Sequence, residues 1–254
     1  MCGRFVITSP PAALRQMFGY LEQPNFPPRH NIAPTQPIPV VIRENGVRHF
    51  RLMHWGLLPA WVKDPAKFSL LINARAETVT ERPAFKNAME RRRCLIPADG
   101  YYEWQTAEKR KRPCFIHRRD GAPIGLAGLA ETWIGPNGEE LDTVAIITAP
   151  ASTDLAMLHH RVPVAIAPDD FDRWLDCGAH DGKTATALLN APHEGEFVWH
   201  EVSTRVNRVA NDDPQLILPM TPEESAAEEQ RAVKKPMPRK SAPVTSEDGQ
   251  GSLF

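Results

Sequence analysis

The sequence predicts an α+β fold in which hairpins of antiparallel strands build a curled sheet or a partly closed barrel, with a handful of helices at its periphery. Two observations lead to this prediction. Turn residues recur between β-rich segments, and helix signals are few and do not alternate with strands as a parallel sheet requires. The chain of 254 residues is long enough for a core, and we place a single domain over residues 2–220.

Three pairs of β-rich segments are separated by turn residues, and we predict a hairpin at each. The first pair is Ile38–Ile42 and Val47–Met53, joined through Asn45-Gly46, which is the favoured pair of a type I′ turn. The other two, with their turn residues in the middle, are Pro113–Arg118, Asp120-Gly121 and Ile124–Leu129, and Ala130–Ile134, Pro136-Asn137-Gly138 and Leu141–Thr148.

Helix signals are confined to four segments, the first of which has Ser9 in front of it as a predicted N-cap. These segments are Pro10–Phe18, Arg82–Arg92, Asp169–Asp176 and Gly182–Asn190. From Thr221 onward the chain has no aromatic or β-branched cluster until its last residues. Such a segment buries too little apolar area to offset the entropy of ordering, so we predict a disordered tail over residues 221–254.

Composition excludes several classes of protein. With 30 Lys and Arg against 31 Asp and Glu, the chain is not a polycation that holds nucleic acid by bulk charge, although a local basic groove stays open. Its cysteines, Cys2, Cys94, Cys114 and Cys177, form no CxxC pair, which argues against a zinc site or a disulfide framework. Without a secretory signal or an apolar run of about 20 residues, a cytoplasmic protein with no membrane partner is expected.

Cys2 offers unusual chemistry if Met1 is removed. Its α-amine, with a pKa of about 7.7–8.0, would then lie beside a thiol with a pKa near 8.5. Such an aminothiol attacks an aldehyde through nitrogen to give an imine, and its sulfur then closes a five-membered ring. It can equally attack an amide carbonyl through sulfur while the amine serves as base. A buried structural cysteine is the third alternative.

Three further segments carry candidate functional groups. In an extended Leu71–Thr78, Asn73, Arg75 and Glu77 would share one face, suited either to a phosphate or simply to solvent, and Arg75 could pair with Glu77. Glu103 stands among aromatic residues in Asp99–Trp104 as a candidate for proton transfer, or faces solvent from an edge strand.

Beside Glu103, Trp104 either belongs to the core or stacks a base. The adjacent His159 and His160 point in different directions on any regular element, so we expect one proton-transfer group and no shared metal site; Arg161 beside them indicates an anion site.

Basic runs and tryptophans supply the remaining candidates. The runs are most simply solvated, with contact to phosphates as the alternative; they are Arg91–Arg93, Lys109–Arg112 and Arg118-Arg119. Trp55 is predicted to lie in the core, and Trp61 to be exposed for stacking.

Six segments, in this order, resemble the SRAP family, the SOS-response-associated peptidases, which shield abasic sites in single-stranded DNA. One of them alone is a weak signal, but six in order are specific, and they extend over residues 2 to about 218. They are Met1–Phe5, Asn31–Pro34, His54–Leu57, Asn73–Glu77, Ala98–Trp104 and His159–Pro163. The one visible departure is Val162, where the family often has Met.

The resemblance implies a DNA damage response protein with lyase-type, DNA–protein crosslinking activity and no metal or cofactor. Cys2 would form a thiazolidine with the ring-opened abasic sugar, Asn73 would hold Cys2 and the sugar, and Glu103 and His159 would manage the protons. The groove for single-stranded DNA would be lined by Arg4, Arg75, Trp104, Thr148 and Arg161, with Trp61 as a further stacking residue. A monomer associated with the nucleoid is expected, and Met1 would be removed by an aminopeptidase or by the protein itself.

Two other functions stay open. An N-terminal-nucleophile glutaminase would also begin Met-Cys-Gly, and Asn137-Gly138 echoes a motif of that class, although a hairpin turn explains it equally well. A non-covalent module for single-stranded DNA would use Cys2 only structurally. Finally, Gln250, Leu253 and Phe254 fit the Gln-x-Ser/Asp-Leu-Phe pentapeptide that binds bacterial sliding clamps, which makes a clamp an expected partner.

Overall fold

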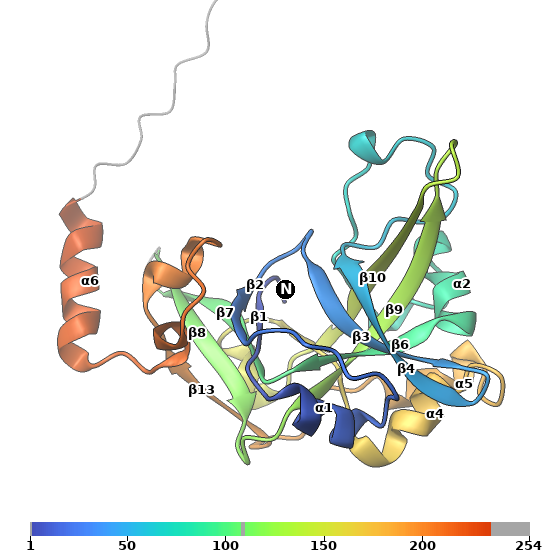
Figure 1. The fold of residues 1–254 in the computed structure, drawn as a ribbon. Coiled ribbons are helices and arrows are strands. Elements are labelled where there is room, and N and C mark those ends of the chain that lie inside the picture. Colours follow the sequence, from blue (N-terminus) through green and yellow to red (C-terminus); the bar gives the residue numbers. More distant parts are fainter. Residues whose placement is uncertain (1, 108–109, 235–254) are drawn as a thin grey trace, which may run out of the picture. The chain divides into compact units, whose positions relative to one another are not determined.

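The structure, a computed structural model, describes residues 2–107 and 110–234. Its residues fall into two units, one ending at Met220 and the other beginning at Thr221. The first unit contains two β-sheets (Figure 1). The strands of the smaller, curled sheet are β1 (Phe5–Ile7), β2 (Arg29–Ile32), β7 (Gly100–Ala107), β8 (Arg110–Arg118) and β13 (Phe197–Glu201), and their order is β13-β8-β7-β1-β2.

The larger sheet closes on itself. Its strands are β3 (Pro37–Glu44), β4 (Val47–Trp55), β5 (Asn73–Arg75), β6 (Arg93–Ala98), β9 (Ile124–Ile134), β10 (Glu140–Pro150), β11 (Arg161–Pro163) and β12 (Ala165–Ile166). Because β9 pairs with β10, the strands β10, β4, β3, β6 and β9 form a five-stranded barrel, to which β5, β11 and β12 are added. The predicted α+β class with a barrel of hairpins is therefore confirmed.

Two of the three predicted hairpins are confirmed. In β3–β4, Glu44 pairs with Val47, and Asn45 (φ 49°) and Gly46 (φ 82°) adopt the positive φ values that a type I′ turn needs. In β9–β10, Ile134 pairs with Glu140 across the predicted turn at Pro136-Asn137-Gly138.

The hairpin predicted between Pro113–Arg118 and Ile124–Leu129 is wrong, because β8 pairs with β7 and β13 whereas β9 belongs to the barrel. Asp120 accepts hydrogen bonds from the Arg118 side chain and the Ala122 N–H. The resulting turn directs the chain from one sheet into the other.

Helices form at the four predicted places, two of them with shorter α-helical cores. The α-helices of the first unit are α1 (Pro11–Phe18), α2 (Pro83–Arg91), α3 (Thr153–Ala156), α4 (Phe171–Leu175) and α5 (Gly182–Ala185). Short 3-10 helices span Pro65–Lys67, Ala76–Thr78, Pro168–Asp170, Thr186–Leu188, Thr204–Asn207 and Pro214–Ile217. The predicted N-cap is wrong: Pro10 caps α1, while the Ser9 amide and hydroxyl donate to Asp99.

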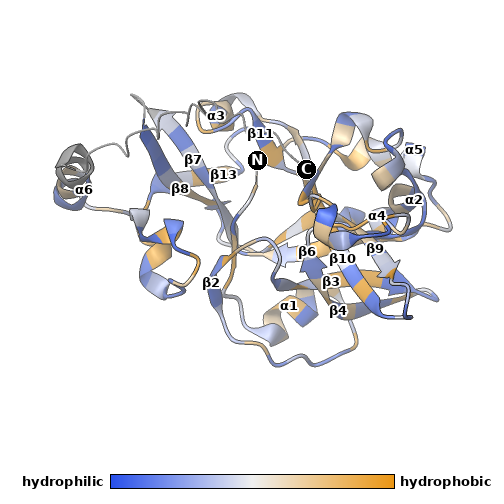
Figure 2. Cartoon of the chain, turned by 90° about the horizontal axis from the view of Figure 1, so that it is seen from above, coloured by the Kyte–Doolittle hydropathy of each residue, from blue (hydrophilic) through white to orange (hydrophobic). Residues whose placement is uncertain are grey.

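Strand β1 joins two hydrophobic cores because successive side chains point to opposite faces. Phe5 and Ile7 enter the main core inside and beside the barrel, whereas Val6 enters a smaller core with Tyr102 and Val206. Hydrophobic residues accordingly gather on the barrel strands in Figure 2. This anchoring on both faces fixes the segment that carries Cys2.

The second unit contains helix α6 (Pro222–Lys234), so the prediction of disorder is wrong for this part of the tail. Thr221 and Glu224 explain it: the Glu224 N–H donates to Thr221 Oγ1, and the Thr221 N–H donates to Glu224 Oε2, a capping box that starts a helix rich in Ala and Glu. The predicted clamp-binding residues Gln250, Leu253 and Phe254 lie outside the described residues. In the described part of the chain, every helix is too short or too polar to traverse a lipid bilayer.

Candidate active site

Cys2 lies completely buried just ahead of β1. Its carbonyl oxygen accepts a hydrogen bond of 2.9 Å from Nδ2 of Asn73, as the predicted role of Asn73 in holding Cys2 requires. Burial raises the pKa of the Cys2 thiol to about 12; the charge of Glu103 adds to this rise, and the Arg4 N–H opposes it. The sulfur is therefore a thiol at neutral pH, and a reaction at sulfur needs a base nearby.

Strand β10 brings the two other predicted segments together. Its Thr148 pairs in parallel with Arg75 of β5 and in antiparallel with Pro163 of β11. The chain after β5 and the chain before β11 thus meet beside β10, although more than eighty residues separate them in sequence.

At this junction Arg161 makes a two-pronged ion pair with Glu77 and also donates to the carbonyl and hydroxyl oxygens of Thr148. The hydrogen bonds from Arg161 are the main reason that the pKa of Glu77 is lowered. The extended segment predicted over Leu71–Thr78 ends at Arg75, where a 3-10 turn begins. Because of this turn, Glu77 pairs with Arg161 and not with Arg75 as suggested from the sequence.

Two predicted DNA contacts are largely covered by the protein in this structure. Thr148 is completely buried and the Arg161 side chain is 9% exposed, and contact of either residue with DNA stays a prediction. The sequence gives the residue type but not its surroundings. Here the Arg161 guanidinium connects β11 to β10 and to the 3-10 turn that follows β5.

Glu103 and His159 line the same cavity of about 820 Å³. Glu103 is 5% exposed on β7, which rules out the solvent-facing alternative. Nδ1 of His159 lies 3.0 Å from the Arg161 backbone nitrogen and 3.2 Å from the Arg161 carbonyl oxygen, so it accepts from the N–H in one neutral tautomer and donates to the carbonyl in the other. Partial burial lowers the pKa of His159, and the charge of Glu103 opposes this shift. His160 stacks on His159 with ring centroids 4.3 Å apart and is itself exposed.

The remaining predicted DNA-binding residues differ in their availability. Arg4 is committed to the framework, since it donates to Oδ1 of Asn31 and to the Val206 carbonyl and lies 5.8 Å from the Trp104 ring centre. Trp104 is half-buried on the cavity wall, and Arg75 is exposed.

The two tryptophans that frame the loop after β4 follow their predictions. Trp61 is 60% exposed and meets Phe68 edge-on at 5.7 Å, whereas Trp55 is buried as predicted. Trp61 therefore presents a ring to solvent, as stacking on a base requires.

Several arginine side chains of the basic runs make hydrogen bonds and ion pairs within the protein. Arg93 is buried and donates to four backbone carbonyl groups, while Arg92 pairs with Glu131. Arg118 pairs with Asp120 and Glu196. In the run Lys109–Arg112, Lys109 lies outside the described residues, but Lys111 lines the cavity that contains Glu103 and His159.

Sequence reasoning missed two polar residues of this cavity, Thr106 and Asn207. Thr106 could have been found, because it follows Trp104 by two positions on the same strand and therefore shares its face. Asn207 could not: it reaches the cavity from a 3-10 turn a hundred residues away in the sequence. Among residues 2–107 and 110–234, no three His, Cys, Asp or Glu side chains cluster as metal ligands would.

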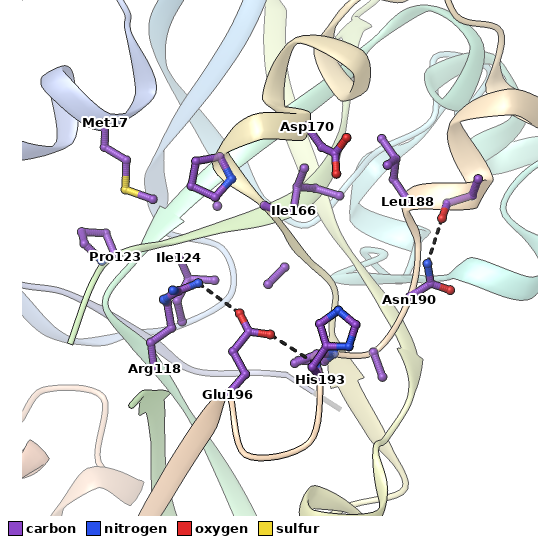
Figure 3. A pocket seen from close by; sticks show the side chains of 17 residues that line it. Met17, Arg118, Pro123, Ile124, Ile166, Asp170, Leu188, Asn190, His193 and Glu196 are labelled. Atoms are coloured by element: carbon purple, nitrogen blue, oxygen red, sulfur yellow. Dashed lines mark hydrogen bonds and ion pairs between the residues drawn. The ribbon is translucent and has the colours of Figure 1, made fainter. Parts of the chain in front are cut away.

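A second hollow of about 300 Å³ has different chemistry (Figure 3). Its charged side chains already have partners: Arg118 pairs with Glu196 at 3.0 Å, and Glu196 also accepts the His193 N–H. Asp170 pairs with Arg173 outside the hollow. The Asn190 amide donates to the Ala187 carbonyl. None of the predicted catalytic residues lines it, so the cavity of Glu103 and His159 is the candidate site.

Comparison with known proteins places this geometry in context. The model of the family described as SOS response associated peptidase (SRAP) matches residues 1–209. The chain is 34% identical over 221 residues to the abasic site processing protein YoqW of Bacillus subtilis (strain 168), a match that covers 85% of this chain and 99% of YoqW. It is 32% identical over 194 residues to the abasic site processing protein YedK of Escherichia coli (strain K12), covering 76% and 85%. A crystal structure of a protein from Bacteroides thetaiotaomicron shares the fold, with a TM-score of 0.78 at 21% identity over 87% of this chain and 100% of the other.

Proposed function

The chain belongs to the SRAP family, and from this premise we propose that it recognises abasic sites in single-stranded DNA and captures them covalently through Cys2. Two of its relatives are named abasic site processing proteins, which supports the recognition of abasic sites. The observation that carries the covalent step is the position of Cys2, held by Asn73 and within the electrostatic reach of Glu103, which shares a cavity with His159.

The proposed reaction needs only groups that this chain supplies. After Met1 is removed, the α-amine of Cys2 adds to C1′ of the ring-opened sugar, and loss of one water gives an imine. The Cys2 sulfur then adds to the same carbon, and the thiol hydrogen ends on nitrogen, which closes the thiazolidine. One water is lost overall and nothing is oxidised or reduced. An imine alone hydrolyses in water, so the sulfur makes the adduct persistent.

Glu103 and His159 are assigned the proton transfers. Because the pKa of the Cys2 thiol is raised to about 12, ring closure requires a base, and the buried carboxylate of Glu103 is suited to take this proton. His159, neutral because its pKa is lowered, can donate an Nε2 hydrogen to the sugar oxygen during ring opening in the tautomer whose Nδ1 accepts the Arg161 N–H. Oδ1 of Asn73 is buried without a hydrogen-bond partner among the described residues, which suits it to accept a hydrogen bond from the bound sugar.

Denaturing gels with an abasic oligonucleotide test the proposal. The unaltered protein should give a shifted band that resists heat, and an intact oligonucleotide should give none. Cys2→Ser should lose this band, whereas Cys114→Ser, at another buried free cysteine, should keep it. An equally stable adduct from Cys2→Ser would contradict the thiazolidine, and binding without any adduct would favour the non-covalent module.

Two further measurements address the remaining alternatives. Release of ammonia from glutamine would favour the glutaminase, whose Asn-Gly signal is here a plain turn with Gly138 at φ 84°. The intact mass of the purified protein shows whether Met1 is absent, and incubation of a chain that retains it shows whether the protein removes Met1 itself.

We also propose that the motif at Gln250, Leu253 and Phe254 binds the sliding clamp, which would concentrate the protein where replication exposes abasic single strands. A labelled peptide of the last dozen residues should bind purified clamp, and replacing Leu253 and Phe254 with alanine should abolish this binding. Unchanged binding by the double variant would remove the clamp from the proposal.

A further inference from the structure

One side of strand β7 is open beside the candidate site. On that side β1 pairs with β7 only at Gly100 and Tyr101, and the last contact is the Tyr102 N–H donating to the Arg4 carbonyl at 2.9 Å. On the other side, β8 pairs with β7 as far as Ala107. From Glu103 onward, no strand in the described part of the chain covers the open side.

The backbone groups on this open side can be assigned from the alternation of an antiparallel ladder. Successive N–H groups point to opposite sides of a strand, so those of Trp104 and Thr106 share the direction of the Tyr102 N–H. The Trp104 N–H makes only a long contact of 3.4 Å with Glu103, and the Thr106 N–H has no hydrogen-bond partner among the described residues. The edge therefore presents the backbone N–H groups of Trp104 and Thr106, each beside the carbonyl group of the same residue, and both residues line the cavity.

Asn207 adds side-chain donors of fixed orientation. The indole N–H of Trp104 donates to Oδ1 of Asn207 at 2.8 Å. Because an indole nitrogen can only donate, the amide oxygen must face Trp104, and the NH₂ group of Asn207 must point elsewhere. The turn that carries Asn207 is anchored: the Val206 side chain is completely buried, and its carbonyl accepts from both Arg4 and Asn31.

Lys111 supplies a charge at the same place. It is exposed on β8, pairs across the ladder with Thr106, and lines the cavity with Trp104, Thr106 and Asn207. We call these four residues the β7 edge site. Its amide and ammonium groups are hydrogen-bond donors, and one carries a positive charge. A phosphodiester, which offers only acceptors and a negative charge, matches this set.

We propose that the β7 edge site binds a phosphodiester group of the DNA strand adjacent to the abasic nucleotide. The proposal rests on the proposed function, because it assumes that the lesion lies at Glu103 and His159 in the same cavity. The edge site then sets the direction in which the strand leaves the lesion, with Lys111 and Asn207 holding the phosphate and Trp104 beside it.

Single-phosphate replacement provides the test. Abasic oligonucleotides carry one neutral methylphosphonate at each flanking position in turn, and affinity is measured by fluorescence anisotropy. One position should weaken binding to the unaltered protein about three- to tenfold, as expected for a charge-assisted hydrogen bond, and should have a clearly smaller effect in Lys111→Ala, where Asn207 remains. Lys86→Ala, an exposed lysine on α2, is the matched control and should respond like the unaltered protein.

Asn207→Asp separates binding from structure. The carboxylate still accepts the Trp104 N–H but can no longer donate to a phosphate, so affinity should fall at least as far as in Asn207→Ala. Affinity equal to that of the unaltered protein would assign Asn207 to positioning Trp104 alone. Additive effects of Lys111→Ala and every methylphosphonate would overturn the edge site. Absence of any covalent adduct from the unaltered protein would instead overturn the proposed function, while affinities for an intact strand would still report on Lys111.

Discussion

The side-chain amide of Asn73 donates a hydrogen bond of 2.9 Å to the carbonyl oxygen of Cys2, and these two residues lie 71 positions apart. Asn73 begins β5, whose pairing with β10 fixes it to the wall of the barrel. Cys2 precedes β1, which is anchored in both hydrophobic cores. The reacting residue is thus held between two rigid elements, and its backbone position should depend on this bond.

Asn73→Ala should slow covalent capture about ten- to a hundredfold, since removing a hydrogen bond from a buried acceptor costs about 1–3 kcal/mol. The rate at saturating abasic oligonucleotide measures this loss. Asn73→Asp should be slower still at neutral pH, because a carboxylate would face the Cys2 carbonyl with no hydrogen to donate. A rate equal to that of the unaltered protein in both variants would show that Asn73 does not position Cys2.

Glu77 is expected to stabilise the fold through Arg161. Because the Arg161 side chain is 9% exposed, Glu77→Gln removes the charge that balances a nearly buried guanidinium, and we expect a loss of about 1–3 kcal/mol in the free energy of unfolding at pH 7. The pKa of Glu77 is lowered in the folded protein, so its contribution is present above the unfolded value near 4.3 and is lost as pH falls through the folded value.

Urea denaturation of the unaltered protein and of Glu77→Gln measures this dependence. Their difference in stability should be constant from pH 7 to about pH 5 and should narrow at lower pH. A difference that persists undiminished down to the lowest pH at which both fold would mean that the substitution disturbs packing and that the lost charge is not the cause.

His159 should make covalent capture sensitive to acid. Its pKa is lowered mainly by burial, so the neutral ring persists below the ordinary value of about 6.5, and the acid limb of the rate should lie below that pH. His159→Gln should abolish this limb and lower the rate at pH 7, whereas His160→Gln, at the exposed neighbour, should retain it. If both variants keep the same acid limb in the capture rate, a group other than His159 controls the pH dependence.

How far the sequence predicts this molecule depends on whether the deciding contact is local. Asn45-Gly46 sets its own backbone geometry, and the β3–β4 hairpin follows from it. Asp120-Gly121 also makes a turn, but the sheet that each flanking strand joins is decided by distant partners, which a local pattern does not contain. Thr221 and Glu224 are a different case: their capping box is a local contact that was present in the sequence, but the composition of the segment led to the prediction of disorder.

In the candidate site, too, residue identities could be predicted from local motifs, whereas burial and pairing could not. Cys2, Asn73, Glu103 and His159 could be named from their motifs, but the motifs do not tell which charged groups are buried. Arg161 has the residue type of a phosphate contact and is used internally, because β10 pairs with both β5 and β11 beside it. Lys111, in a run predicted to be mainly solvated, proves to line the cavity.

Arg75 is the residue of the predicted DNA groove that remains free to meet a phosphate. It is exposed at the end of β5, two positions from Asn73, whereas Arg4 and Arg161 donate to groups of the protein itself. Arg75→Ala should therefore reduce the slope of log affinity against log salt by about 0.7 for single-stranded DNA, the value for one released counterion.

Arg91→Ala is the matched control, because Arg91 is equally exposed on α2 and does not line the candidate cavity. It should leave the slope unchanged. Arg161→Ala should lower the stability of the fold, since it leaves Thr148 and Glu77 without their partner, and its effect on binding should follow the fraction of folded protein. The opposite result would be a salt slope that falls in Arg161→Ala, with the stability of that variant intact, and stays constant in Arg75→Ala. It would mean that the ion pair between Arg161 and Glu77 opens to meet DNA. The strand would then pass nearer to β11 than to β5.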